Sequence, residues 1–188
     1  PASTQIKNHF GIYSVSQGGT SLCHARTCMF YDVLSGYVID SMIAPASVGE
    51  ITLINTMVNT INDTDSIVIL DRGFGYFSTC KNLINQKQKF CIRVTTSQSM
   101  FSKLVLSNPS DDFITEWIAS DAEKVTCKKY GWDTKSITVR VTKIVLRTGE
   151  IELLVSSLFD MDLINKNDLR ELYELRWNVE EGFKKLKP

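Results

Sequence analysis

A short apolar run at residues 66–70, SIVIL, restricts the fold more than any other stretch of the chain. The run is too short for a helix, and its β-branched residues favour a strand. A strand without polar alternation is typical of one buried on both faces of a parallel or mixed sheet. Helices are expected on either side, one opened by a capping box from Ser47 to Glu50 and one over about 76–86. Another strand is expected at 90–94, so the sequence predicts an α/β fold with three layers.

Two other stretches are rich in β-forming residues. Runs at 22–31 and 37–43 flank Leu34-Ser35-Gly36, which is typical of a hairpin turn. Between 95 and 158 helical periodicity fades, and β-branched residues gather around Thr148-Gly149. We interpret 95–158 as a mostly β insertion subdomain within a single domain of residues 1–188.

The last helix is expected at 167–187, with Asn165 or Asn167 as its N-cap. At helical spacing its apolar residues form one stripe, and a set of polar residues lies along one flank of that stripe. These polar residues are Tyr173, Arg176, Glu180 and Lys187. A solvated amphipathic helix would also explain the pattern, because such helices are commonly rich in Glu and Lys.

Asp71 is the second candidate for a functional residue. It directly follows the apolar run, at the carboxyl end of the expected strand, where open α/β sheets gather their ligands. Gly73 would let the backbone turn sharply behind it. A plain Asp-x-Gly turn at the end of a strand is the alternative reading.

Two motifs together resemble a known family. The spacing Tyr173-x2-Arg176-x3-Glu180-x6-Lys187 resembles the Y-R-E-K signature of one branch of bacterial insertion-sequence transposases, members of the DDE superfamily. The order of a strand, Asp71-Arg72-Gly73-Phe74, a strand ending in Ile92-Arg93-Val94, a β insertion and the last helix is similar to the catalytic core of that family. His9-Phe10-Gly11 and Tyr31-Asp32-Val33 extend the resemblance over nearly the whole chain.

The resemblance implies an RNase H-like core that cleaves and joins DNA. In that family two aspartates and one glutamate hold two Mg²⁺ or Mn²⁺ ions. By this resemblance Asp71 is the second aspartate and Glu180 the glutamate, both as metal ligands. The remaining expected DNA contacts are Tyr173, Arg176 and Lys187 to phosphate, and Trp117 or Trp132 to an extruded base.

One departure from the family pattern concerns the first aspartate. No acidic residue precedes Asp32, and both Asp32 and Asp40 look like hairpin residues. We therefore expect the chain to be a fragment that lacks the first metal ligand and the region after the last helix, and to be close to inactive. A nuclease without strand transfer and a non-catalytic DNA-binding remnant are the alternative functions.

The composition limits the partners. Twenty-one basic residues balance twenty-one acidic ones, so contact with DNA needs a local basic surface. No apolar run approaches the length of a membrane span, and no signal segment opens the chain, which favours the cytoplasm. The resemblance implies that this is a bacterial cytoplasm, with the protein associated with the nucleoid. The five cysteines are expected to be reduced and mostly buried. The expected partners are double-stranded DNA, as transposon ends and target, and a second copy of the chain.

Overall fold

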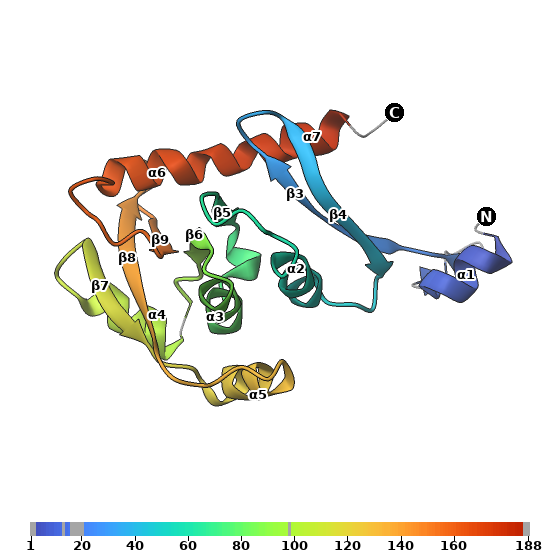
Figure 1. The fold of residues 1–188 in the computed structure, drawn as a ribbon, viewed down its shortest axis with the longest axis horizontal. Coiled ribbons are helices and arrows are strands. Elements are labelled where there is room, and N and C mark those ends of the chain that lie inside the picture. Colours follow the sequence, from blue (N-terminus) through green and yellow to red (C-terminus); the bar gives the residue numbers. More distant parts are fainter. Residues whose placement is uncertain (1–2, 13, 16–20, 98, 186–188) are drawn as a thin grey trace.

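The fold of this computed structural model is organised around a five-stranded mixed sheet (Figure 1). The structure describes residues 3–12, 14–15, 21–97 and 99–185. Sheet order is β5-β6-β9-β8-β7. Strand β5 is parallel to β6, and the other neighbours are antiparallel. The strands are β5 (Ile67–Leu70), β6 (Lys89–Val94), β7 (Asp112–Trp117), β8 (Ile137–Val145) and β9 (Ile151–Ser156).

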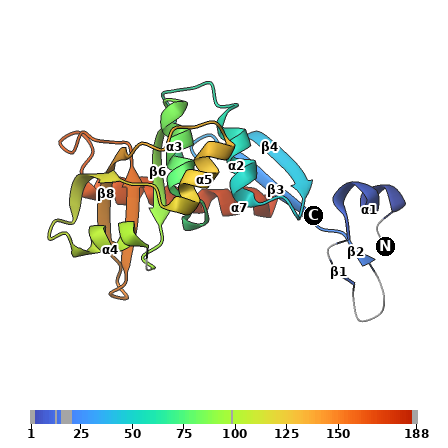
Figure 2. The same cartoon turned by 90° about the horizontal axis from the view of Figure 1, so that it is seen from below.

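Helices cover both faces of this sheet, because successive strand residues point to opposite sides. One face packs against α2 (Glu50–Val58), α3 (Phe77–Asn85), α4 (Met100–Ser107) and α5 (Asp121–Lys129) through the larger apolar cluster. The other face, with Cys91 and Leu154, packs against Leu169 and Tyr173 of α6 (Lys166–Glu174). Figures 1 and 2 show the sheet between these two layers. The α/β class with a mixed sheet flanked by helices is thereby confirmed, and it is consistent with an RNase H-like core.

The apolar run is a strand, but it is not fully buried on both faces as the sequence predicts. Within the described chain β5 pairs only with β6, so it lies at an edge of the sheet. Val68 and Leu70 are buried, whereas Ile67 and Ile69 are only half-buried. One face of β5 therefore has full cover and the other only partial cover.

The predicted hairpin forms a separate two-stranded sheet. Strand β3 (Ala25–Asp32) pairs antiparallel with β4 (Tyr37–Pro45), with a register shift at Phe30/Tyr31. Gly36 takes a φ of 77° in the turn, a conformation that favours glycine. The N-terminal elements α1 (Thr4–Phe10), β1 (Ser14–Val15) and β2 (Ser21–Leu22) lie beyond the far end of this hairpin, away from the central sheet (Figure 2).

Two predicted helix starts have different outcomes. The prediction of a capping box at Ser47 is wrong, because Gly49 is the N-cap of α2 and no side chain caps this helix. Asn165 is confirmed as the N-cap of the last helical segment, where it forms a reciprocal capping box with Asp168. This segment continues from α6 through a 3₁₀ turn, η2 (Leu175–Trp177), into α7 (Asn178–Lys185). A continuous helix is thus interrupted by one tighter turn, and residue 187 lies outside the described residues.

The stretch 95–158 contributes more than strands. It contains β7, β8 and β9, which share one sheet with β5 and β6, and it also contains α4 and α5. A separate β-rich subdomain at 95–158 stays a prediction. In the described part of the chain, no helix is long and apolar enough to cross a membrane.

Candidate active site

Asp71 lies where β5 ends and a 3₁₀ turn, η1 (Arg72–Phe74), begins. Its Oδ1 accepts hydrogen bonds from the backbone N–H of Arg72, at 2.7 Å, and from the hydroxyl of Tyr173, at 3.0 Å. Tyr173 reaches it from α6 and is itself only 4% exposed. Two segments that are distant in the sequence thereby fix one orientation of the Asp71 carboxylate, which remains 43% exposed.

Arg176 joins Asp71 to Glu180. Its Nη1 lies 4.0 Å from Oδ2 of Asp71 and 3.7 Å from Oε1 of Glu180. Arg176 belongs to η2 and Glu180 lies four residues later on α7, a spacing at which side chains of a helical segment are neighbours. The guanidinium also stacks on Trp177, with 4.5 Å between its carbon and the ring centroid. Both predicted acidic residues therefore converge on one cation.

The surroundings of Asp71 favour its charged form. Burial raises the pKa of its carboxyl, but the Arg72 N–H, the Arg176 guanidinium and the Tyr173 hydroxyl outweigh burial and hold that pKa below its usual range. Burial and the nearby Asp71 charge raise the pKa of Tyr173. At neutral pH the pair is consequently an ionised carboxylate that accepts from a protonated phenol.

Asp71 and Glu180 fit a divalent cation as far as two carboxylates can. Hard oxygen ligands suit Mg²⁺, which protein sites commonly bind through one or two carboxylates while water and phosphate fill the other positions. Glu180 is 48% exposed, so its carboxylate is open to solvent and ligands. Across the described residues, no group of three or more His, Cys, Asp and Glu side chains gathers at a possible metal site.

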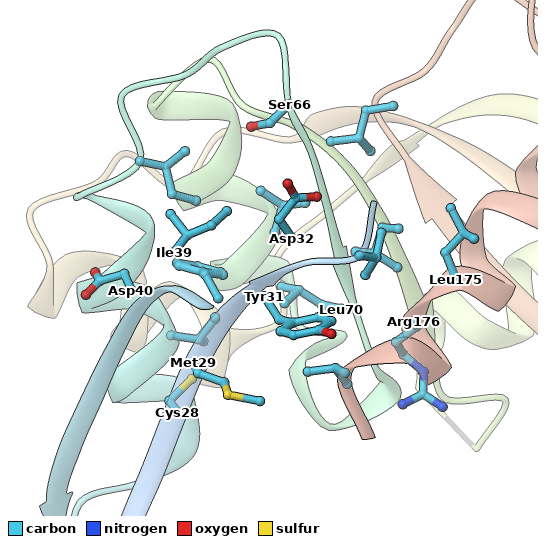
Figure 3. Close-up of a pocket in the computed structure, with 18 of the residues that line it drawn as sticks. Cys28, Met29, Tyr31, Asp32, Ile39, Asp40, Ser66, Leu70, Leu175 and Arg176 are labelled. Carbon is cyan, nitrogen blue, oxygen red and sulfur yellow. The ribbon is translucent and has the colours of Figure 1, made fainter. Parts of the chain in front are cut away.

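A groove of about 1100 Å³ opens next to these side chains (Figure 3). Its walls include Asp71, Arg176 and Glu180, together with the consecutive residues 27–34 of the hairpin and the stretch 65–71 that contains β5. Alternate residues line a groove over the face of a strand, whereas consecutive residues line one along its edge. Edges of β3 and β5 therefore face this groove, and in the described chain neither strand has a partner on that side.

The two early aspartates at this groove have local roles. Asp32 accepts hydrogen bonds from the backbone of Leu34 and the hydroxyl of Ser35, within the hairpin turn. Asp40 accepts from the hydroxyl of Thr60 at 2.9 Å. Both are hairpin residues, as the sequence predicted, and neither has a recorded contact with Asp71 or Glu180.

A comparison with protein families finds a match to the transposase DDE domain over residues 4–188. The chain belongs to the DDE-domain transposases. No protein in a comparison with curated sequences matches it. This membership establishes a transposase family and the nucleotidyl-transfer chemistry that goes with it. It leaves the insertion-sequence branch and its Y-R-E-K signature as predictions.

The remaining predicted site residues of the transposase lie elsewhere. Trp117 ends β7, the strand farthest from β5 in the sheet, and stacks on Phe101 in the core with 4.1 Å between ring centroids. Trp132 stacks on Tyr130 at 4.7 Å and packs against the same core. The structure does not bring either tryptophan to Asp71, so base stacking by them stays a prediction. Lys187 lies outside the described residues.

Three residues of the transposase site have no clear signal in the sequence. Trp177 is 57% exposed and stacks on the Arg176 guanidinium, and only its position next to Arg176 in the sequence could have indicated it. Arg93 pairs with Glu152 at 2.9 Å and adds a positive charge near Asp71. Gly75 lets the backbone behind Asp71 pack closely on β6, because a Cβ at this position would lie 2.5 Å from the carbonyl oxygen of Arg93.

Gly73, which was expected to allow the sharp turn behind Asp71, does not require glycine. A Cβ at Gly73 would meet nothing within 4 Å, and the backbone there has no positive φ. The chain instead forms the 3₁₀ turn η1, in which the Phe74 N–H donates to the Asp71 carbonyl at 2.9 Å.

Proposed function

We propose that this chain is the catalytic core of a cut-and-paste DNA transposase that cleaves phosphodiester bonds at transposon ends and joins the 3′-hydroxyl ends to target DNA. The convergence of Asp71 and Glu180 on Arg176 carries the proposal. Asp71 lies at the end of β5 and Glu180 on α7. In a helix that only faces solvent, the charged side chains would not be expected to lie against the end of a strand. Membership in the DDE transposases supports the reaction class.

Asp71 and Glu180 are the proposed ligands of Mg²⁺ or Mn²⁺. Two divalent metal ions bound at such carboxylates would activate the attacking water or 3′-hydroxyl and stabilise the leaving oxygen. Tyr173 and the Arg72 N–H orient Asp71 and keep it ionised at neutral pH. Arg176 and Lys187 are proposed to bind the phosphate of the transferred strand, the former through its planar fork. A phosphate contact of the Tyr173 hydroxyl remains part of the proposal.

A complete site in this family has a third carboxylate, and the groove supports a place for it. In the described chain the edges of β3 and β5 that face the groove have no partner strand, so they are open to pairing with an extended segment. Asp71, Arg176 and Glu180 line the same groove, so an aspartate on that segment would meet them. We propose that an extended segment pairing in this groove supplies the first aspartate.

The proposed partners are double-stranded DNA and a second transposase subunit, in the cytoplasm of a bacterium. A non-catalytic DNA-binding protein is the second candidate. It is favoured by one observation, the lack of a third acidic ligand among the described residues. A nuclease without strand transfer differs from the first proposal only in failing to join the cleaved ends.

Excision assays in cells that carry the gene with its flanking DNA test the proposal. Asp71→Asn and Glu180→Gln are each expected to abolish excision while gel-shift binding to the flanking DNA persists. Asp121→Asn and Glu174→Gln are matched controls, since both residues are exposed and form only surface ion pairs. Excision by either of the first two variants would contradict the assignment. An intact protein that binds DNA without any excision or cleavage would favour the non-catalytic candidate.

A further inference from the structure

Arg176 is held between two carboxylates without a close hydrogen bond to either. Its distances of 4.0 and 3.7 Å exceed the roughly 2.7–2.9 Å of a charge-assisted N–H···O bond. The side chain is only 13% exposed, and in the described chain its buried Nε has no hydrogen-bond partner. The guanidinium is therefore kept in place by charge and by stacking, with part of its hydrogen-bonding capacity unused.

Other arginines of the same chain show what close contacts look like here. Arg140 donates to both oxygens of Asp112, at 2.8 and 2.6 Å. Arg93 lies 2.9 Å from Glu152, and Arg170 lies 2.9 Å from Glu174. Arg26, at 3.6 Å from Glu50, donates instead to a backbone carbonyl at 2.7 Å. The contact of Arg176 with Asp71 and Glu180 is thus unusually loose for a buried guanidinium that faces two acids.

Such looseness has a physical reason if the two carboxylates are arranged for a different cation. Asp71 is oriented by the Arg72 N–H and the Tyr173 hydroxyl, and neither of these contacts involves Arg176. Without a counter-ion the carboxylates of Asp71 and Glu180 would repel each other, and Arg176 supplies a positive charge that reduces this repulsion. We infer that Arg176 is the resident counter-ion of the Asp71–Glu180 pair and that a divalent cation entering the site displaces its guanidinium.

The inference rests on the proposed function, because it assigns a second role to a residue of the same site. Displacement would leave the guanidinium on the exposed ring of Trp177, where it already stacks. A released arginine, next to newly bound metal, could then turn its free donors to a phosphate. Metal binding would in this way prepare the phosphate contact, and without metal Arg176 would offset one of the two negative charges.

Metal affinity tests the competition directly. Mn²⁺ binding to the isolated chain is measured by electron paramagnetic resonance for wild type, Arg176→Gln and Arg176→Lys, with Arg170→Gln as the matched control on the same helical segment. Removing a unit charge about 4 Å from the site is expected to tighten Mn²⁺ binding by about tenfold in Arg176→Gln. Arg176→Lys and the control are expected to stay near wild type. Adding Asp71→Asn to Arg176→Gln is expected to remove the gain.

A second measurement reports the arginine itself. Titration with diamagnetic Mg²⁺ is expected to change the fluorescence of Trp177, obtained as the difference between wild type and Trp177→Phe, and to leave it unchanged in the Arg176→Gln background. Circular dichroism verifies that each variant is folded.

The outcomes separate the two claims. Equal, weaker or undetectable Mn²⁺ binding by a folded Arg176→Gln variant would overturn the counter-ion role, even if Asp71→Asn and Glu180→Gln weaken binding as the proposed metal site requires. Mn²⁺ binding that neither acidic variant alters would overturn the metal site itself, and with it the proposed function.

Discussion

Replacing Tyr173 by phenylalanine removes one hydroxyl and leaves the buried ring in place. In the structure that hydroxyl donates to Oδ1 of Asp71 at 3.0 Å. A hydrogen bond to a charged acceptor contributes roughly 1.5–3 kcal/mol when both groups are buried. Asp71 is 43% exposed, so water screens the interaction and part of the lost contact can be replaced. We therefore expect Tyr173→Phe to lower the free energy of unfolding by about 1 kcal/mol at pH 7, or roughly 2–4 °C in melting temperature.

The pH dependence of this loss identifies its cause. The folded pKa of Asp71 lies below its usual value, so ionisation of Asp71 stabilises the folded state above the unfolded pKa of about 3.9 and ceases to do so as pH falls through the lower folded value. The difference between wild type and Tyr173→Phe should be constant from about pH 7 to 5 and shrink below about pH 4.

Urea unfolding followed by circular dichroism at pH 7, 5 and 3.5 measures the effect, with the exposed Tyr37→Phe as control. A loss no larger than that of the control, or one that does not change with pH, would refute the role of Tyr173 in holding Asp71.

Three further predictions concern parts of the fold that support the site. Arg140→Ala should lower the free energy of unfolding, measured in urea, by roughly 3–5 kcal/mol, because fully buried Arg140 donates to both oxygens of Asp112. Arg170→Ala is the control, with an expected loss below about 1 kcal/mol. An equally small loss for Arg140→Ala would contradict the reasoning. Gly182→Ala places a Cβ 2.8 Å from the Tyr31 ring, and this close contact should lower the free energy of unfolding by about 1–3 kcal/mol. The higher helix propensity of alanine offsets roughly 1 kcal/mol of that loss. Gly73→Ala should be neutral, and equal melting temperatures for the two variants would contradict the close packing of α7 on β3. Thiol titration of the native protein should modify Cys23 or Cys28 first. Burial raises the pKa of Cys91 to about 12, and the thiols of Cys80 and Cys127 are buried as well. Rapid modification of all five cysteines would show that the core is open to solvent.

Local signals in the sequence predicted several elements correctly. The hairpin and the Asn165 cap both depend on neighbouring residues, and both are confirmed. The capping box at Ser47 has the same kind of signal and fails, since Gly49 starts the helix two residues later. Local spacing shows that a cap can form, while packing of the helix decides where it begins.

Features that depend on tertiary packing were not predictable. Arg140 occupies a polar position in an alternating strand, which suggests exposure, yet helices and loops cover both faces of β8 and its partner Asp112 is distant in sequence. Trp117 looked available for DNA, but it is a core residue between Phe77 and Phe101. The edge position of β5 depends on which strands pair, and the apolar run alone carries no such information.

The candidate site was predictable in part because the spacing of the last helix places its polar residues on one side. That spacing could not show that a 3₁₀ turn at Leu175–Trp177 carries Arg176 to Asp71. Nor could it show that the phenol of Tyr173 contacts a carboxylate.

Anomalous diffraction from a crystal of the protein soaked in Mn²⁺ tests the central claim most directly. We expect a manganese peak bound by oxygens of both Asp71 and Glu180, at the end of β5. A structure in which these two carboxylates point to different faces, or in which manganese binds only elsewhere, would contradict the claim that they form the metal-dependent site of this transposase.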